Sequence, residues 1–199
     1  MSKKQKSLID LIIDVGELPR NEPSTVIDTT LDEPTTLRQG DIKLKDKNEV
    51  LSRSKENTQN LAKELWQKNE IYFRKKPIIF ALEGQMGAGK THFVKGLAKA
   101  IGVSETITSP SYDLLCSYNI KKSNISLVHL DTWRMIDPGK EFTGLEIKKL
   151  LLNNDILAVE WADRIINNIK EYSDDAIIIW IKIEYGKNEN DRIISWGDL

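Results

Sequence analysis

The chain has 199 residues, of which 40% are hydrophobic and 30% are charged, and its formal net charge is −1. A near-neutral charge gives no electrostatic case for direct nucleic-acid binding, which ordinarily depends on an excess of Lys and Arg. The single cysteine, Cys116, excludes an intramolecular disulfide and favours a reducing compartment.

Residues 1–50 are predicted to form an extension or linker that precedes a domain of residues 51–199. An apolar stretch near the N-terminus fits a short amphipathic helix, read either as a weakly ordered helix or as a docking segment for a partner groove. Its apolar face consists of Leu8, Leu11, Ile12 and Val15. Residues 17–46 are rich in Pro, Thr, Asp and Glu, a composition typical of linkers and disordered segments.

The same N-terminal stretch does not match a signal peptide, because two aspartates interrupt it and no small-residue cleavage site follows. Elsewhere no apolar run approaches the roughly 18 residues of a membrane span. We therefore expect a cytoplasmic protein with no membrane association.

A helix is predicted over residues 54–70, with Ser54 as its N-cap, and a short apolar strand over residues 77–83. The next eight residues are Gly84-Gln85-Met86-Gly87-Ala88-Gly89-Lys90-Thr91, which fit the phosphate-loop pattern G-x-x-x-x-G-K-[ST]. A helix is expected to follow and to stop at Gly102, with an apolar face made of Phe93, Val94, Leu97, Ala98 and Ile101.

The order of strand, glycine loop and helix aims backbone N–H groups and a helix N-terminus at phosphate oxygens. In this pattern Lys90 reaches the β- and γ-phosphates, and the Thr91 hydroxyl ligates Mg²⁺. The motif therefore predicts a nucleotide-binding protein.

Residues 104–112 combine hydroxyl side chains with Pro110. This segment fits an ordinary loop, and it also fits a switch in which a hydroxyl senses the γ-phosphate. The pattern alone favours the ordinary loop.

Residues 112–118 and 125–130 are predicted to form a hairpin whose second strand leads into Asp131. A carboxylate at the end of an apolar strand after the phosphate loop occupies a Walker-B-type position, where it binds Mg²⁺ directly or through water. His129 shares a face with Asp131. A lone histidine in a strand is more often a hydrogen-bonded structural residue than a catalyst.

A helix is expected over residues 141–153, and residues 156–161 form another apolar strand that ends in an acid, Glu160. Glu160 is a second candidate for metal ligation or water orientation. Residues 177–183 and 192–196 are predicted to form a final hairpin. The element order indicates an α/β fold, a P-loop NTPase-like mixed β-sheet flanked by helices.

Several segments together resemble one family, the small bacterial P-loop ATPases called TsaE, which are needed for making threonylcarbamoyladenosine in tRNA. The resemblance spans about residues 54–196. Besides the phosphate loop, it rests on Thr108-Ser109-Pro110-Ser111-Tyr112, His129-Leu130-Asp131-Thr132-Trp133-Arg134 and Val159-Glu160-Trp161. It implies an ATPase that works with TsaD-like and TsaB-like proteins, which carry out threonylcarbamoyl transfer. Such an ATPase would meet tRNA only through that complex.

By position, the resemblance implies that ATP phosphates bind to the loop residues Met86, Gly87, Ala88, Gly89, Lys90 and Thr91. Thr91 and Glu160 are expected to hold Mg²⁺, and Asp131 to ligate or orient the metal and its water. Trp161 is expected near the phosphates as part of the catalytic group, with Lys90, Asp131 and Glu160. Ser54, Ser111 and Arg192 are expected near the nucleotide.

The chain departs from the family pattern at a few positions. Ser111 stands where Thr is usual, His92 where a second Thr is frequent, Thr132-Trp133 where Leu-Tyr is usual, and Ala162 where Pro is usual.

Two other functions share a phosphate loop and remain open: a small-molecule or nucleoside kinase, and a nucleotide-gated adaptor without turnover.

Overall fold

The computed structural model describes residues 26–28, 35–38, 45–110 and 113–199. The chain divides into two compact units, residues 1–43 and residues 44–199. In the first unit, β1 (Val26–Asp28) pairs antiparallel with β2 (Thr35–Arg38). The helix expected near residues 7–15 lies outside the described residues, as does Ser111.

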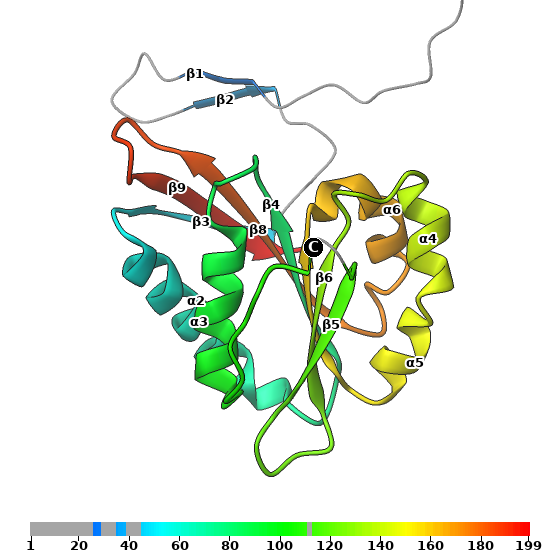
Figure 1. Cartoon of the computed structure of the whole chain (residues 1–199). Helices are drawn as coiled ribbons and strands as arrows, with labels where there is room; N and C mark the ends of the chain where they lie inside the picture. Colours follow the sequence, from blue (N-terminus) through cyan, green and yellow to red (C-terminus); the bar gives the residue numbers. More distant parts are fainter. Residues whose placement is uncertain (1–25, 29–34, 39–44, 111–112) are drawn as a thin grey trace, which may run out of the picture. The chain divides into compact units, whose positions relative to one another are not determined.

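The second unit is built on a mixed sheet that has seven strands among the described residues, in the order β3-β9-β8-β4-β7-β6-β5 (Figure 1). The strands are β3 (Lys45–Ser52), β4 (Ile78–Glu83), β5 (Leu115–Asn119), β6 (Ser126–Asp131), β7 (Ile156–Glu160), β8 (Ile177–Tyr185) and β9 (Arg192–Asp198). Strands β8, β4, β7 and β6 are mutually parallel, whereas β3, β9 and β5 pair antiparallel with their neighbours. The predicted mixed α/β sheet is confirmed.

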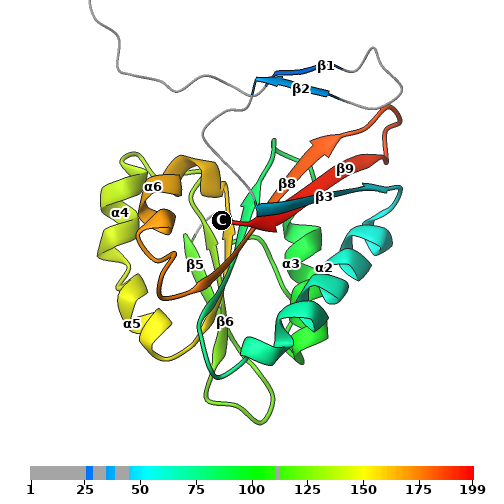
Figure 2. The ribbon, with the colours of Figure 1, turned by 180° about the vertical axis from the view of Figure 1, so that it is seen from behind.

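Helices cover both faces of this sheet, as the two opposite views show (Figures 1 and 2). On one face lie α2 (Lys55–Asn69) and α3 (Lys90–Ile101), and on the other lie α4 (Pro138–Gly144), α5 (Ile147–Leu152) and α6 (Ile166–Lys170). Two 3₁₀ turns, η1 (Glu70–Tyr72) and η2 (Ala162–Ile165), follow α2 and β7. None of the helices in the described part of the chain is long and apolar enough to cross a membrane.

The central strands are apolar along their whole length because both faces of the sheet are covered. The first five residues of β4, Ile-Ile-Phe-Ala-Leu, are all buried. Helix α3 packs its predicted apolar face on the sheet, and each such large apolar side chain contributes about 1.5–3 kcal/mol relative to leaving it exposed. This packing holds both ends of the phosphate loop, since β4 enters the loop and α3 leaves it.

Two predicted elements differ from the structure. The helix expected over residues 141–153 is two helices, because Glu146 takes a left-handed conformation (φ 51°) that a right-handed helix cannot continue through. Strand β3 lies largely in the segment expected to be linker, and it pairs with β9 from Lys45↔Asp198 to Ser52↔Arg192.

Candidate functional site

The phosphate loop occupies residues 84–91, between the carboxyl end of β4 and the first turn of α3. Gly89 is the N-cap of α3 with φ 111°, a left-handed conformation that glycine adopts at little cost, and no side chain caps this helix end. A Cβ added at Gly89 would meet nothing within 4 Å. The first N–H groups of α3 are therefore available at the loop, as an anion site requires.

Lys90 is buried, and its ammonium group is directed back onto the loop that precedes it. Nζ donates hydrogen bonds to the carbonyl oxygens of Gly84 (2.7 Å) and Gln85 (2.9 Å), and it lies 3.9 Å from the centre of the Trp161 ring. Burial lowers the pKa of Lys90, and the carboxylates of Glu160, Asp131 and Asp163 oppose that shift. A residue whose pKa is shifted by burial and by specific charged partners is a candidate for a functional site.

Thr91 and Glu160 meet where α3 begins and β7 ends. The Thr91 hydroxyl donates to Oε1 of Glu160 at 2.8 Å, and His129 Nε2 lies 2.9 Å from the same oxygen. A hydroxyl and a carboxylate supply the hard oxygen ligands that Mg²⁺ prefers, so this pair fits that cation. No cluster of three or more His, Cys, Asp or Glu side chains arranged for metal binding was found in the part of the chain that the structure describes.

Asp131 is placed beside Glu160 by the sheet, because the two residues are register partners at the ends of β6 and β7. Its Oδ1 accepts from the backbone N–H of Trp133 (2.9 Å), and its Oδ2 lies 3.5 Å from the Ser109 hydroxyl. The loop expected to be either ordinary or switch-like therefore approaches Asp131 through Ser109. Ser111 itself falls outside the described residues.

Two tryptophans stack next to Lys90. The rings of Trp133 and Trp161 lie 4.4 Å apart between centroids, with 29° between their planes. Trp161 has φ 58°, an uncommon conformation for a bulky residue, and such strain is concentrated at functional sites. The turn at Trp161 redirects the chain as it leaves β7, next to Glu160.

Arg164 holds the segment that follows Asp131. Its guanidinium donates to the carbonyl oxygens of Thr132, Trp133 (2.5 Å) and Met135 (2.8 Å). Sequence reasoning missed Arg164. The only available signal was a basic residue three positions after Trp161, and nothing in that spacing indicates bonds to carbonyl groups.

Arg192 and Tyr185 contact the phosphate loop from the β8–β9 hairpin. Arg192 Nε donates to the carbonyl of Ala88 (2.9 Å) and Nη2 to that of Gly87 (3.3 Å), and Tyr185 donates its hydroxyl to the carbonyl of Met86 (2.6 Å). Arg192 also stacks on the Tyr185 ring at 4.4 Å. Arg192, which was expected near the nucleotide, is bonded to carbonyl groups of the phosphate loop.

Ser54 is the N-cap of α2, as predicted, and its hydroxyl is bonded within that helix to the backbone N–H (3.2 Å) and side chain (3.0 Å) of Asn57.

His92 is half-buried in the first turn of α3. Burial lowers the pKa of His92, and the nearby Lys55 and Lys95 lower it further.

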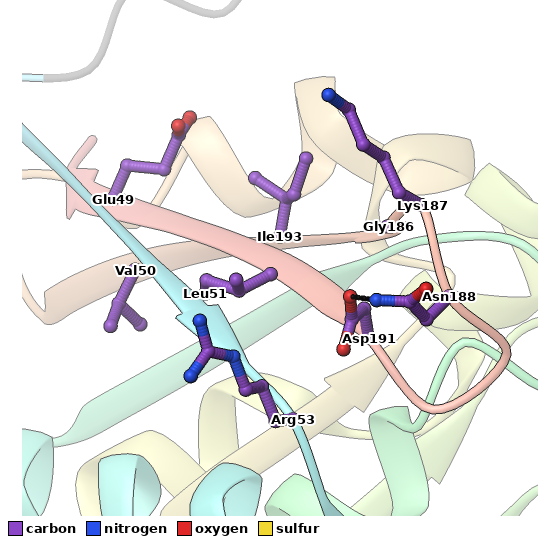
Figure 3. Close-up of a pocket in the computed structure, with 9 residues that line it drawn as sticks. All are labelled: Glu49, Val50, Leu51, Arg53, Gly186, Lys187, Asn188, Asp191 and Ile193. Atoms are coloured by element: carbon purple, nitrogen blue, oxygen red, sulfur yellow. Dashed lines mark hydrogen bonds between the residues drawn. The ribbon is translucent and has the colours of Figure 1, made fainter.

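Two cavities adjoin these groups. One of about 500 Å³ borders the start of the phosphate loop and is lined by Glu83, Gly84, Gln85, Trp161, Asp163, Lys182, Ile183, Glu184 and Tyr185. The other, of about 530 Å³, lies between β3 and the β8–β9 turn, and its lining residues include Leu51, Arg53, Asp191 and Ile193 (Figure 3). The second cavity does not contain the phosphate loop, although its lining includes the chain neighbours of Ser54 and Arg192.

Comparison with known proteins gives a consistent result. The family model described as "Threonylcarbamoyl adenosine biosynthesis protein TsaE" matches residues 52–194. The tRNA threonylcarbamoyladenosine biosynthesis protein TsaE of Aquifex aeolicus is 38% identical over 119 residues, which cover 58% of this chain and 77% of that protein. The TsaE protein of Haemophilus influenzae is 34% identical over 125 residues, covering 57% and 76%.

The crystal structure of YdiB from Bacillus subtilis has a similar fold, with a TM-score of 0.55 over 79% of this chain and 88% of that one, at 24% sequence identity. The family match covers most of the unit that carries the phosphate loop, Asp131 and Glu160. The chain therefore belongs to the TsaE family and has a role in the biosynthesis of threonylcarbamoyladenosine in tRNA.

Proposed function

We propose that the protein binds and hydrolyses Mg-ATP, and that this turnover supports threonylcarbamoyl modification of tRNA adenosine within a complex containing TsaD-like and TsaB-like proteins. One observation carries the proposal: the Thr91 hydroxyl, the last position of the phosphate-loop motif, is bonded to the strand-terminal carboxylate of Glu160 at 2.8 Å. This bond joins the two parts of the chain that a magnesium-dependent NTPase needs to bring together.

In this proposal the loop backbone from Met86 to Thr91 and the Lys90 ammonium hold the phosphates. The bonds from Lys90 to its own loop carbonyls are exchanged for bonds to β- and γ-phosphate oxygens. Thr91 and Glu160 hold Mg²⁺, with Asp131 ligating it or orienting its water. When bound, the metal neutralises charge on the phosphate oxygens.

The remaining proposed contacts surround these groups. Trp161 covers Lys90 and limits the access of water to the phosphates. The Ser111 hydroxyl senses the γ-phosphate. Ser54 and Arg192 lie towards the nucleoside.

The central test is the substitution Lys90→Ala. Removing a positioned charge that stabilises the transferring phosphoryl group should lower phosphate release by about 10²-fold or more. Lys99→Ala, on an exposed position of the same helix, is the matched control and should retain the wild-type rate. The assay needs the partner proteins present as well as absent, and unchanged turnover by Lys90→Ala in both conditions would refute the assignment.

The same assay separates the alternatives. A small-molecule or nucleoside kinase transfers phosphate to an added acceptor and releases little without one. A nucleotide-gated adaptor binds ATP and releases none. The proposed ATPase releases phosphate without any nucleoside acceptor.

A further inference from the structure

We propose that His129 is a positioning residue for the metal site, an inference that rests on the proposed magnesium-dependent function. Its imidazole N–H fixes one oxygen of the Glu160 carboxylate and leaves the other oxygen for the cation. The chain contains two histidines, and this one is completely buried.

The sheet places His129 against Glu160. His129 lies on β6 opposite Ala158 of β7, and Glu160 is two residues further along β7. Because side chains two residues apart in a strand share a face, the imidazole and the carboxylate project on the same side of the sheet. The contact follows from strand register rather than from a flexible loop, so its geometry is held by the core.

Both hydrogen bonds to the Glu160 carboxylate fall on one oxygen. Oε1 receives the Thr91 hydroxyl at 2.8 Å and faces His129 Nε2 at 2.9 Å, whereas neither bond involves Oε2. Two donors on one oxygen restrict rotation of the carboxylate, and a carboxylate that cannot rotate presents its other oxygen in one direction. Supporting groups of this kind are known to tune metal affinity in protein sites.

The contact with Glu160 uses one of the two ring nitrogens of His129. Nδ1 is buried and has no hydrogen-bond partner. A carboxylate oxygen can only accept, so Nε2 carries the hydrogen that is donated to Glu160, and Nδ1 is left as an unsatisfied polar atom. Burying an unsatisfied polar atom costs free energy, and an apolar side chain would fill the same space without that cost. The bond to Glu160 is what the imidazole provides and an apolar residue could not.

The test compares four proteins, the wild type and the substitutions His129→Leu, His129→Asn and His129→Gln. Leu fills the space without a donor. Asn and Gln carry the same amide, but only Gln can extend its N–H to the place of Nε2. The measurement is Mn²⁺ binding in the presence of ADP, followed by electron paramagnetic resonance, with binding of metal-free ADP and thermal unfolding measured on the same samples.

We expect His129→Leu and His129→Asn to weaken Mn²⁺ binding by about 10-fold or more while metal-free ADP binding is unchanged, and His129→Gln to recover most of the loss. If Leu does not fold at this buried position, the comparison of Asn with Gln decides the result. Wild-type Mn²⁺ affinity in the Leu or Asn variant, or equal weakening by Asn and Gln, would overturn the inference and leave the proposed function intact. Wild-type protein that binds ADP but no Mn²⁺ would overturn both.

Discussion

Glu160 joins parts of the chain that are distant in sequence. Its side chain is bonded to Thr91 of α3 and contacts His129 of β6, and its backbone carbonyl accepts from the N–H of Thr132 at 3.2 Å. A single residue at the end of β7 thus links the phosphate loop with the strand that ends in Asp131. In the proposed function these two acids hold or orient the metal, so substitutions at Glu160 and Asp131 are expected to act on metal-dependent chemistry.

We predict that Glu160→Gln and Asp131→Asn each lower Mg²⁺-dependent ATP hydrolysis by roughly 10²-fold, because a neutral amide keeps the shape but loses the charge that a hard cation needs. In the proposed function nucleotide affinity depends mainly on the loop backbone and Lys90, so it should change much less. Steady-state hydrolysis over a range of Mg²⁺ concentrations, paired with binding of a fluorescent nucleotide, measures both. Normal hydrolysis by both variants would assign the two acids a structural role only.

Glu83, which precedes the phosphate loop, is an acid whose ionisation lowers the stability of the folded state. Burial raises the pKa of Glu83 above its usual 4.5, against the lowering effects of the hydrogen bond from Trp180 and the charge of Lys182, and Asp163 and Glu184 raise it further. An acid whose pKa is higher in the folded state destabilises that state once it ionises. Stability should therefore fall as pH rises from about 4.5 through the folded-state pKa, with the full cost present at neutral pH.

We predict that Glu83→Gln raises the melting temperature at neutral pH, because Gln removes the partly buried charge and keeps an acceptor for Trp180 Nε1, which donates at 2.9 Å. The gain should shrink as the pH is lowered towards 4.5, where the wild-type carboxyl is increasingly protonated. Glu64→Gln, at an exposed position of α2, is the control and should have little effect. A melting temperature below that of the wild type at every pH would contradict this interpretation.

At the level of elements, the predictions from sequence succeeded where a pattern recurs locally, and they missed the break at Glu146 and a strand that depends on distant contacts. The strand–loop–helix unit, the 54–70 helix and both hairpins were predictable, since each has an apolar period or an identifiable cap. Strand β3 was not predictable, because its sequence, Lys-Asp-Lys-Asn-Glu-Val-Leu-Ser, has little apolar alternation. This edge strand is instead held in the sheet by its pairing with β9.

The same distinction applies to the candidate site. The motif predicted the positions of Lys90 and Thr91, and the ends of apolar strands predicted Asp131 and Glu160. Arg164 and Tyr185 were not predicted, because both bond to backbone carbonyls, and any residue can supply a carbonyl. Such contacts leave no signal in the residue types of the partner segment.

The packing of α2 on α3 depends on Gly96. A Cβ built at Gly96 would lie 2.5 Å from Cα of Gln59, so the two helix backbones approach too closely for any side chain. We predict that Gly96→Ala destabilises the protein by roughly 1–3 kcal/mol, because backbone must move to relieve the overlap and this outweighs the better helix propensity of Ala.

The control for this prediction is Gly144→Ala at the end of α4, where an added Cβ would meet nothing within 4 Å. It should be neutral or stabilising by about 0.4–1 kcal/mol. Chemical denaturation of the two variants beside the wild type provides the comparison. Equal stability of Gly96→Ala and wild type would mean that the helices separate at little cost.

For the whole molecule, the division into residues 1–43 and 44–199 bears on where the domain that carries the phosphate loop begins. The sequence placed that boundary after residue 50, which falls inside β3. We propose a boundary near residue 44, since β3 extends the sheet by pairing with β9 and Ser52 at its end is buried and bonded to Thr58 at 2.8 Å.

Two truncations test this proposal. Removing residues 1–43 should leave the free energy of unfolding of the 44–199 unit and its nucleotide affinity unchanged, because β3 and every proposed site residue are retained. Removing residues 1–50 also deletes the partners of Asp198, Trp196, Ser195 and Ile194. At about 1 kcal/mol for each lost ladder hydrogen bond, that deletion should cost roughly 2–4 kcal/mol and expose the edge of β9. Chemical denaturation of both truncated proteins, with nucleotide binding measured in parallel, separates the boundaries. Equal stability of the two would favour the boundary after residue 50, and a loss in the shorter truncation would show that residues 1–43 stabilise the domain.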